Sequence, residues 1–353
     1  MQTDMIETSF LSVFAFLTFF IFLITNKFSE KFFSNVLLDT DYIKPQAFHD
    51  EPISRCGGIA SAISLILFFI IYYILYSTLV YEYIFICLSL FMLGYFDDIK
   101  IQISPKTRLT LMAIFLTVYI LTLSIQIEHI DLVFLNYILE NKIFSIIFVL
   151  LCFLFIINGA NLVDGFNGLL VINLIIINSL LLAINLKNNQ IEFSFLITAQ
   201  IIILISFLLF NFPKAKMFLG DSGSYLYGSL IALNTIITNN LNPQISSFFF
   251  CILLFYLFFE VFFSFFRKIQ QNKSPFHPDQ EHLHMLVYKF FLKKFGTYKS
   301  NYLVSLSINL TFLVFVGPSI IFADNGLICK YWFFSLIIIY SVIYIRLYRL
   351  TKN

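Results

Sequence analysis

The sequence predicts an all-α, polytopic integral membrane protein, a single helical bundle with about eleven transmembrane helices. Of its 353 residues, 59% are hydrophobic and only 12% are charged, and the mean hydropathy is +0.89. Soluble domains carry roughly 25% charged residues. Long apolar runs follow one another with short polar interruptions, and no stretch is polar enough for a separate soluble domain. We therefore expect one membrane domain over residues 1–353.

A membrane-spanning helix needs about 20 mostly apolar residues. The apolar runs predict spans near residues 8–25, 59–77, 80–96, 109–126, 143–157, 169–186, 193–210, 223–238, 246–266, 301–321 and 328–345. The run 143–157 is short for a span, and the run 223–238 opens on Gly and Ser. The N-terminal run lacks a basic start and a small-residue cleavage site, so we interpret it as a retained first span.

The placement of Lys and Arg predicts the orientation. With eleven spans, alternate connections lie on the same side of the membrane. Nineteen Lys and Arg residues fall in 26–58, 97–108, 211–222, 267–300 and the C-terminal tail, whereas only Lys142, Lys187 and Lys330 fall on the other side. Cytoplasmic loops carry the excess of Lys and Arg. We therefore expect the N-terminus outside and the C-terminus in the cytoplasm.

A polar stretch from Asn158 to Leu169 separates two apolar runs, and it also lies on the predicted cytoplasmic side. It contains Asn158, Asn161, Asp164 and Asn167 among three glycines. Polar backbone near membrane depth is tolerated where it lines a cavity or a water-facing site, and a carboxylate there indicates function. An ordinary loop rich in turn-forming residues is the alternative.

Two further acidic motifs fall on the same side. Asp97 and Asp98 end the third span, where two adjacent carboxylates need a cation, a metal or water between them. The alternative is a solvated helix end paired with nearby Lys and Arg. Asp221 follows Gly220 at the start of the eighth span, where free backbone N–H groups favour anions. Asp221 serves either as a cap of that helix or as a magnesium ligand.

Histidines complete the polar content of this side. His282 and His284 flank one residue and would point the same way on an extended segment. They form a metal pair, a phosphate-binding pair or merely a solvated face. His49 and Arg55 precede the second span as candidate phosphate contacts, and Gly57-Gly58 allows close backbone approach.

Carboxylates, a hard cation and a cationic rim are what a diphosphate substrate needs. Mg²⁺ is usually held by one or two carboxylates together with substrate phosphates. The polar residues of the predicted cytoplasmic side therefore favour phosphoryl transfer at the membrane surface.

The motifs, taken in order, resemble those of the polyprenyl-phosphate N-acetylhexosamine-1-phosphate transferases, glycosyltransferase family 4. They read Gly94-x-x-Asp97-Asp98, Asn158-x-x-Asn161-x-x-Asp164-Gly165, Asn211-x-Pro213-x-x-Lys216-x-Phe218-x-Gly220-Asp221-x-Gly223-Ser224, and Ser274-Pro275-Phe276-x-Pro278-Asp279-x-x-His282-x-His284. The runs from Arg55 to Gly58 and from Asp164 to Gly168 look most like the branch that initiates O-antigen or other surface glycans.

The resemblance implies an enzyme of the bacterial cytoplasmic (inner) membrane that works on its cytoplasmic face. It would transfer a sugar-1-phosphate from a UDP-N-acetylhexosamine to undecaprenyl phosphate and release UMP, with Mg²⁺ or alternatively Mn²⁺ as cofactor. Membrane lipid is a further partner, a homodimer is compatible with the family, and no nucleic acid is involved.

The resemblance also assigns roles to residues. Asp97 is the base that deprotonates the lipid phosphate, Asp98 is its partner in the catalytic pair, and Asp221 is the catalytic magnesium ligand. Asn158, Asn161, Asp164, Asn167, Asn211 and Lys216 belong to the substrate site, Phe218 stacks on uracil, and His282 and His284 contact the diphosphate or the sugar. His49 and Arg55 are the remaining substrate contacts.

This sequence departs from the family pattern at four positions. Asn167 stands where Asp is frequent, which leaves an acceptor for uracil but removes a base or a metal ligand. Met285 stands where many relatives have a further His, and Phe48 where some have a basic residue. Glu260 replaces a more usual Asp within a span, and the sequence assigns it no role.

Two alternative functions remain open at the level of sequence. The first is the peptidoglycan branch, phospho-N-acetylmuramoyl-pentapeptide transferase, which the phrase from Ser274 to His284 disfavours. The second is a transporter, which would place ionisable residues near the bilayer centre and repeat its spans in pairs. The acids of this chain lie at one rim instead.

Overall fold

The computed structural model describes residues 2–33, 36–39, 52–101, 103–274 and 279–352, and its architecture confirms the all-α class. The helices are α1 (Gln2–Phe33), α2 (Gly57–Tyr76), α3 (Tyr81–Asp98), α4 (Pro105–Leu123), α5 (Val133–Leu139), α6 (Lys142–Val163), α7 (Leu169–Lys187), α8 (Ile191–Asn211), α9 (Gly220–Leu241), α10 (Ser247–Leu253), α11 (Phe255–Gln270), α12 (Leu283–Phe295), α13 (Thr297–Val316) and α14 (Gly326–Lys352), with the 3₁₀ helix η1 (Gly317–Phe322). A small antiparallel hairpin joins β1 (Leu38–Asp39) to β2 (Ile53–Ser54).

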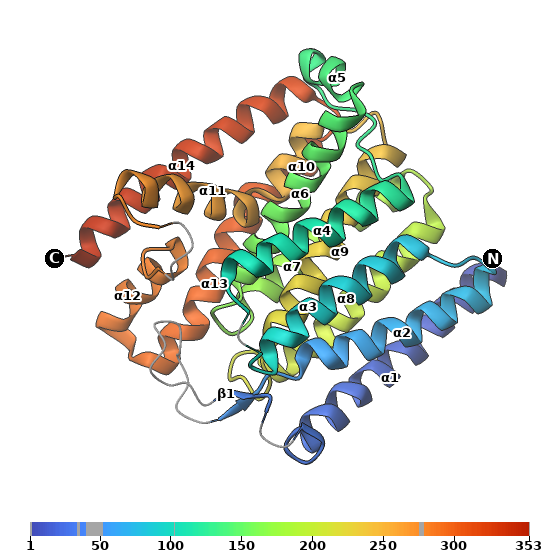
Figure 1. Cartoon of the computed structure of the whole chain (residues 1–353), viewed down its shortest axis with the longest axis horizontal. Helices are drawn as coiled ribbons and strands as arrows, with labels where there is room; N and C mark the ends of the chain where they lie inside the picture. Colours follow the sequence, from blue (N-terminus) through green and yellow to red (C-terminus); the bar gives the residue numbers. More distant parts are fainter. Residues whose placement is uncertain (1, 34–35, 40–51, 102, 275–278, 353) are drawn as a thin grey trace.

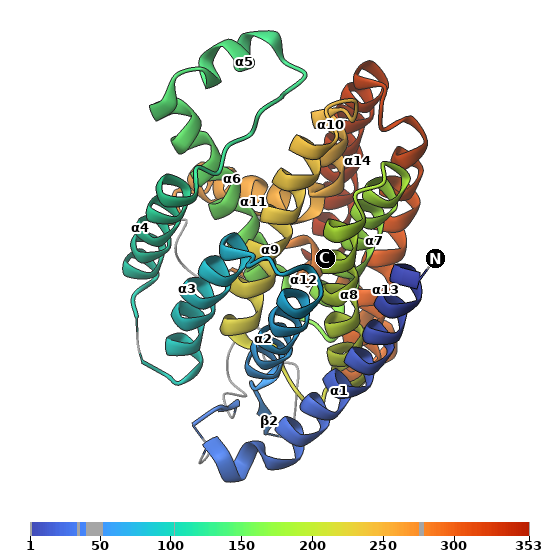
Figure 2. The same ribbon diagram turned by 90° about the vertical axis from the view of Figure 1, so that its right-hand side faces the viewer.

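The bundle has two distinct ends. The β1–β2 hairpin lies at one end and α5 protrudes at the opposite end (Figures 1 and 2). At the hairpin end, hydrogen bonds join a connection to β2, from Phe218 N to Ser54 O, and another connection to the beginning of α13, from Asn167 N to the Asn301 side chain. Others join connections at the α5 end, such as Asp131 N to Ser247 Oγ. Alternate connections therefore meet at the same end, as the predicted order of spans requires.

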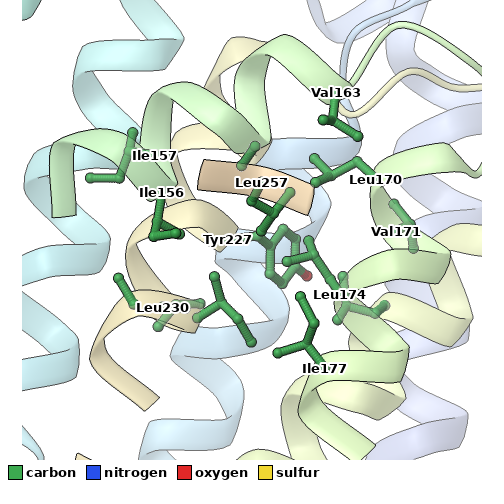
Figure 3. Packing of buried hydrophobic residues seen from close by; sticks show 14 of the residues in the cluster. Ile156, Ile157, Val163, Leu170, Val171, Leu174, Ile177, Tyr227, Leu230 and Leu257 are labelled. Atoms are coloured by element: carbon green, nitrogen blue, oxygen red, sulfur yellow. The ribbon is translucent and has the colours of Figure 1, made fainter. Parts of the chain in front are cut away.

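Helix α9 lies at the centre of the bundle, between α3, α6, α2 and α7 (Figure 1). It is buried along almost its whole length, from Ser222 to Asn239. Apolar side chains of α6, α7 and α11 surround its Tyr227 (Figure 3). Small residues allow this proximity, because a Cβ on Gly228 would lie 2.8 Å from Ile157 Cα. The position of α9 explains why a helix with many Ser, Asn and Gly residues is tolerated inside a membrane bundle.

Each of the eleven predicted spans falls on a helix or, for 246–266, on the pair α10 and α11. Eight helices of the described chain are long and apolar enough to cross a membrane: α1, α2, α4, α6, α7, α8, α13 with η1, and α14. The pair α10 and α11 passes the same test together but is bent by 75° at the break. Helices α3 and α9 fall outside this set, because acidic or polar residues dilute their apolar content.

Two predicted boundaries were wrong. Helix α6 runs to Val163, so Asn158 and Asn161 lie on its last turns and the connection is only residues 164–168. The predicted loop 267–300 contains α12, an amphipathic helix whose Lys content resembles that of a loop. Helix α6 thus extends into a polar stretch, and α12 is a separate helix within one. Tertiary packing stabilises helices in such stretches, and local composition does not reveal it.

Candidate active site

The core of the site is a contact between the end of α3 and the beginning of α9. Asp98 is the last residue of α3, and its Oδ1 and Oδ2 accept the N–H groups of Asp221 and Ser222, each at 2.9 Å. Asp98 is only 2% exposed. A carboxylate at a helix N-terminus satisfies free N–H groups and complements the helix dipole. Asp98, rather than Asp221, therefore caps α9.

Glycine makes this contact possible. A Cβ on Gly94 would lie 2.5 Å from Ser222 Cα, and a Cβ on Gly220 would lie 2.6 Å from Asp98 Oδ2. Gly220 also has φ of +77°, a conformation that only Gly adopts without cost. The sequence Gly220-Asp221 is thus the turn that lets α9 begin directly against the Asp98 carboxylate.

Because Asp98 caps α9, the carboxylate of Asp221 is available for other contacts. Asn161 Nδ2 donates to Asp221 Oδ1 at 2.7 Å and also lies 3.0 Å from Ser224 Oγ. The α6 face that carries Asn161 thereby fixes one oxygen of Asp221. The other oxygen, Oδ2, lies 3.9 Å from Arg108 Nη1.

Two arginines flank the acids. Arg108, in the first turn of α4, forms an ion pair of 3.1 Å with Asp97, as the alternative of a helix end paired with nearby Lys and Arg predicts, although the Asp97 side chain is mostly buried. Arg55 bonds Asp39 through Nε and Nη2, at 3.1 and 2.6 Å, and its Nη1 lies 3.7 Å from Asp98 Oδ1. Both guanidinium groups are partly exposed, so they can also reach an anionic substrate.

The cluster carries excess negative charge. Among the described residues whose charges interact here, the acids are Asp39, Asp97, Asp98, Asp164 and Asp221, and the cations are Arg55 and Arg108. Burial, and secondly the charge of Asp221, raises the pKa of Asp98 to about 7. Burial likewise raises the pKa of Asp97, against the effect of Arg108, and that of Asp164, where Asp221 and Asp98 add to it. These three groups lie at helix ends, beyond the predicted spans.

A hard divalent cation fits this charge pattern. The described residues contain no group of three or more His, Cys, Asp or Glu side chains arranged to hold a metal by themselves. Mg²⁺ does not need such a group, since one or two carboxylates and substrate phosphates suffice. Asp221, whose side chain is 29% exposed and faces Arg108 rather than a backbone amide, is the carboxylate best placed to contribute.

The histidines form a second, buried group. His282 and His284 are 4% and 0% exposed, so the solvated alternative is excluded, and their rings stack with centroids 5.4 Å apart. His282 Nδ1 lies 3.1 Å from Glu260 Oε1, and His284 Nδ1 lies 3.3 Å from the Tyr256 hydroxyl. Burial lowers the pKa of His284 to about 3, so its ring is neutral. Its Nε2 is buried and has no hydrogen-bond partner within the described chain.

The connection 164–168 links the two groups. Asp164 contributes to the acidic cluster, and the ring of Phe166 packs edge-on against His284 with centroids 5.8 Å apart. Asn167 N donates to Asn301 Oδ1 at 2.9 Å. The connection between α6 and α7, which also contacts the beginning of α13, therefore joins the acids to the histidines at the hairpin end of the bundle.

The remaining predicted site residues have mainly scaffold contacts. Asn211 joins Gly168 N at 2.6 Å to Met217 O at 2.9 Å, and Asn167 Nδ2 donates to Pro213 O at 3.0 Å. Asn158 Nδ2 bonds Leu154 O in its own helix at 2.7 Å. These side chains shape the loops around the site, so any influence of Asn211 on a substrate is indirect.

Three further positions complete the comparison with the sequence. Phe218 is half-buried, and its backbone joins β2 and the start of α2, where Gly57 N donates to Phe218 O at 3.0 Å. The Lys216 side chain is exposed on the same loop. His49 lies outside the described residues, so its predicted role stays a prediction.

The sequence did not predict Arg108 or Tyr340 as site residues, and it assigned no role to Glu260. Arg108 was considered only as a partner of the acidic pair at a solvated helix end, and no site role was predicted for it. Tyr340, in the distant α14, carried no signal. Glu260 was left without a role, although an acid within an apolar run is itself a signal of function.

Fold and site together define a multi-pass helical membrane protein with an acidic, arginine-flanked centre at one end of its bundle. The family model described as Glycosyl transferase family 4 matches residues 80–239. Those residues contain Asp97, Asp98, Asp164 and Asp221, so the segment that carries the acidic cluster is similar to glycosyl transferase family 4.

Similar curated proteins agree with this family. The undecaprenyl-phosphate alpha-N-acetylglucosaminyl 1-phosphate transferase of Thermotoga maritima is 28% identical over 252 residues, 71% of this chain and 72% of that protein. A probable undecaprenyl-phosphate N-acetylglucosaminyl 1-phosphate transferase of Bacillus subtilis is 25% identical, over 77% of this chain and 76% of that protein. The phospho-N-acetylmuramoyl-pentapeptide-transferase of Dictyoglomus turgidum is 34% identical, over 41% of this chain and 48% of that protein.

Proposed function

We propose that this protein transfers N-acetylhexosamine-1-phosphate from a UDP-sugar to undecaprenyl phosphate at the cytoplasmic face of a bacterial inner membrane. The products are a polyprenyl-diphosphate-sugar and UMP, the first membrane step of a cell-envelope glycan of the O-antigen type. The observation that carries the proposal is the convergence of Asp97, Asp98, Asp221 and Arg108 at the N-terminus of the central helix α9. The Thermotoga maritima and Bacillus subtilis relatives, which match over most of their length, are named for this class of reaction.

In this reaction an oxygen of the lipid phosphate attacks the phosphorus that carries the sugar. The bond from that phosphorus to the oxygen shared with the UMP phosphate breaks, and UMP leaves. Asp97 takes the last proton from the lipid phosphate, and the Arg108 guanidinium beside it holds the anions in place. Arg55 contributes positive charge next to Asp98. Phosphoryl transfer depends mainly on positioning and charge stabilisation.

Asp98 and Asn161 act as positioning residues. Asp98 anchors the first turn of α9, and Asn161 fixes one oxygen of Asp221. Asp221 would hold Mg²⁺, or alternatively Mn²⁺, which when bound neutralises charge on the diphosphate and on the leaving UMP. The excess of acids over arginines in the cluster supports a cation in this role.

The test is exchange of radiolabelled UMP into UDP-GlcNAc by purified protein with Mg²⁺ and undecaprenyl phosphate. Asp97→Asn and Asp221→Asn should each lower the rate by about 10²-fold or more, because a general base and a metal ligand contribute at least that much. Glu192→Gln, an exposed acid at the other end of the bundle, is the matched control. Exchange by both site variants at the wild-type rate would remove the proposal.

The second donor to assay is UDP-MurNAc-pentapeptide. The match to the Dictyoglomus turgidum protein motivates it, although that match covers less than half of either chain. A preference for this donor would assign the chain to the peptidoglycan branch. A panel of UDP-N-acetylhexosamines identifies the sugar in the same assay.

A further inference from the structure

Residues 279–284 lie along a seam between α11 and α14, and side chains from both helices hold them. Arg267 of α11 donates to the Asp279 carboxylate and to Glu281 O, and the Tyr344 hydroxyl of α14 donates to the same carbonyl at 2.8 Å. Two turns earlier on α11, Glu260 holds the next part of the segment. Figure 1 shows the C-terminal half of α14 alongside α11 and α12.

Glu260 is 1% exposed and has three hydrogen-bond donors. Its Oε1 accepts from His282 Nδ1 at 3.1 Å and from Leu283 N at 3.0 Å, and its Oε2 accepts from the Tyr340 hydroxyl. Leu283 is the first residue of α12. Glu260 therefore caps α12 and fixes the His282 ring at the same time, while Tyr340 fixes Glu260 from the other side.

The consequence concerns the second nitrogen of His282. Because Nδ1 donates to Glu260, the proton on that nitrogen is fixed, and Nε2 is the ring atom that remains for a substrate. A carboxylate that holds the far nitrogen of a functional His determines its tautomer and its orientation. The His282 ring also stacks on the His284 ring, and this contact further restricts the orientation of the His282 ring plane.

We propose that Glu260 and Tyr340 are positioning residues that act through His282, so that α14 helps to build the site. The inference rests on the proposed function, in which His282 Nε2 contacts the diphosphate or the sugar. Neither side chain touches a substrate itself. The sequence left Glu260 without a role. In this proposal its negative charge orients the His282 imidazole.

A double-mutant cycle tests this relationship. Glu260→Gln keeps the shape and an acceptor for Nδ1 but removes the charge, and it should lower kcat/KM in the UMP-exchange assay about 10–100-fold, as loss of such outer contacts does. In a His282→Gln background the same change should cost less than about 2-fold, because residues that act through one another are not additive. Losses that multiply in the double variant would overturn the proposal.

Tyr340→Phe removes a single hydroxyl from α14 and should reduce kcat/KM several-fold with an unchanged KM for the UDP-sugar. Tyr331→Phe makes the same chemical change on the same helix at a side chain that is 65% exposed, and it is the matched control. Rates are normalised to UMP-binding sites, so that a misfolded fraction does not count as a loss of turnover. Equal turnover for Tyr340→Phe and Tyr331→Phe would contradict the role of Tyr340.

A spectroscopic measurement separates this inference from the proposed function. The chain has five His residues, so ¹⁵N-histidine labelling gives a small set of ring signals, and a His282→Gln variant assigns one of them. The Nδ1–H proton of His282 should resonate far downfield and move upfield in Glu260→Gln, because a neutral amide accepts more weakly than a carboxylate. An identical signal in both proteins would refute the Glu260 contact, whatever the enzyme's activity. Absence of exchange by the wild type would instead refute the proposed function.

Discussion

The two adjacent aspartates at the end of α3 have different surroundings and therefore different roles. Asp97 faces Arg108, whereas Asp98 is buried and accepts hydrogen bonds from two backbone amides of α9. The sequence showed only that two like charges stand side by side. The contact that separates their roles joins positions more than a hundred residues apart, so no local pattern reveals it.

The different surroundings of these aspartates predict different stability effects. Asp98→Asn places an NH₂ group against one of two backbone donors and removes a charged acceptor, so it should destabilise the protein by about 2 kcal/mol. Asp97→Asn should cost less than about 1 kcal/mol, because its ion pair with Arg108 is partly exposed. Thermal unfolding of the two variants in detergent compares them directly. Equal melting temperatures would show that Asp98 does not anchor α9.

His284 predicts a loss of stability in acid. Burial lowers its pKa to about 3 in the folded protein, against the opposing charge of Glu260, whereas an ordinary His has a pKa of 6.5. Below pH 6.5 the unfolded chain binds a proton that the folded chain excludes, so stability falls as the pH drops towards 3. The slope reaches at most about 1.4 kcal/mol per pH unit. Above pH 6.5 this group contributes no pH dependence.

The check is the unfolding midpoint of wild type and His284→Gln at pH 7 and at pH 5. The wild type should lose more stability over this interval than the variant, because only the wild type carries the buried imidazole. A parallel decline of both proteins would show that other groups dominate the acid response.

At the scale of elements, α9 is held by polar contacts inside the bundle. Asn234 is fully buried and meets Tyr83 of α3 at 2.6 Å, Asn178 of α7 at 3.0 Å and Gln200 of α8 at 2.8 Å. Each partner lies on a different helix. A polar hub in an apolar interior fixes the rotation of α9, because turning the helix would leave several groups without partners.

Asn234→Leu should therefore destabilise the bundle by about 2–4 kcal/mol, since three polar side chains lose a partner at once. Tyr83→Phe removes one of these contacts and should cost roughly a quarter to a half as much. Unfolding titrations in mixed micelles measure both variants. If Tyr83→Phe costs as much as Asn234→Leu, the contacts do not act as a hub.

The sequence predicted the helices better than it predicted their ends. Apolar runs mark the eight described helices that are long and apolar enough to cross a membrane, because the bilayer requires such runs whatever the tertiary structure. The last turns of α6 were missed because Asn158 and Asn161 favour turns locally, and packing against α9 overrides that preference. Helix α12 was missed because its Lys residues, and the His282-x-His284 motif at its start, resemble a loop. Local composition carries no information about the Glu260 and Asp98 caps that start α12 and α9.

Motif order predicted which residues gather, and the fold explains why they do. Asp97, Asp98, Asp164 and Asp221 each sit at a helix end, and the alternating direction of the helices brings these ends to one side. Their individual contacts followed only from the structure. Asp98 is a cap, Asp221 faces Asn161, and Asp164 has no hydrogen-bond partner for its carboxylate among the described residues.

At the scale of the whole molecule, charge separates along the bundle axis. Arg55, Arg108 and Arg267 lie at the hairpin end, where helices α2, α4 and α11 begin or end. Lys142 and Lys187 lie at the opposite end, at the start of α6 and the end of α7. The hairpin end is the one with the candidate site. The positive-inside rule therefore predicts a cytoplasmic site and an external α5.

Cysteine labelling tests this orientation with one probe position at each end. Tyr137 on α5 is 76% exposed, and Tyr137→Cys should react with a membrane-impermeant maleimide in intact spheroplasts. Lys294→Cys, on the exposed end of α12, should react only after permeabilisation. The parent chain, labelled in parallel, gives the background from its five native cysteines. Labelling of Lys294→Cys in intact spheroplasts would reverse the orientation and place the acidic cluster outside the cell, where no UDP-sugar donor is available to it.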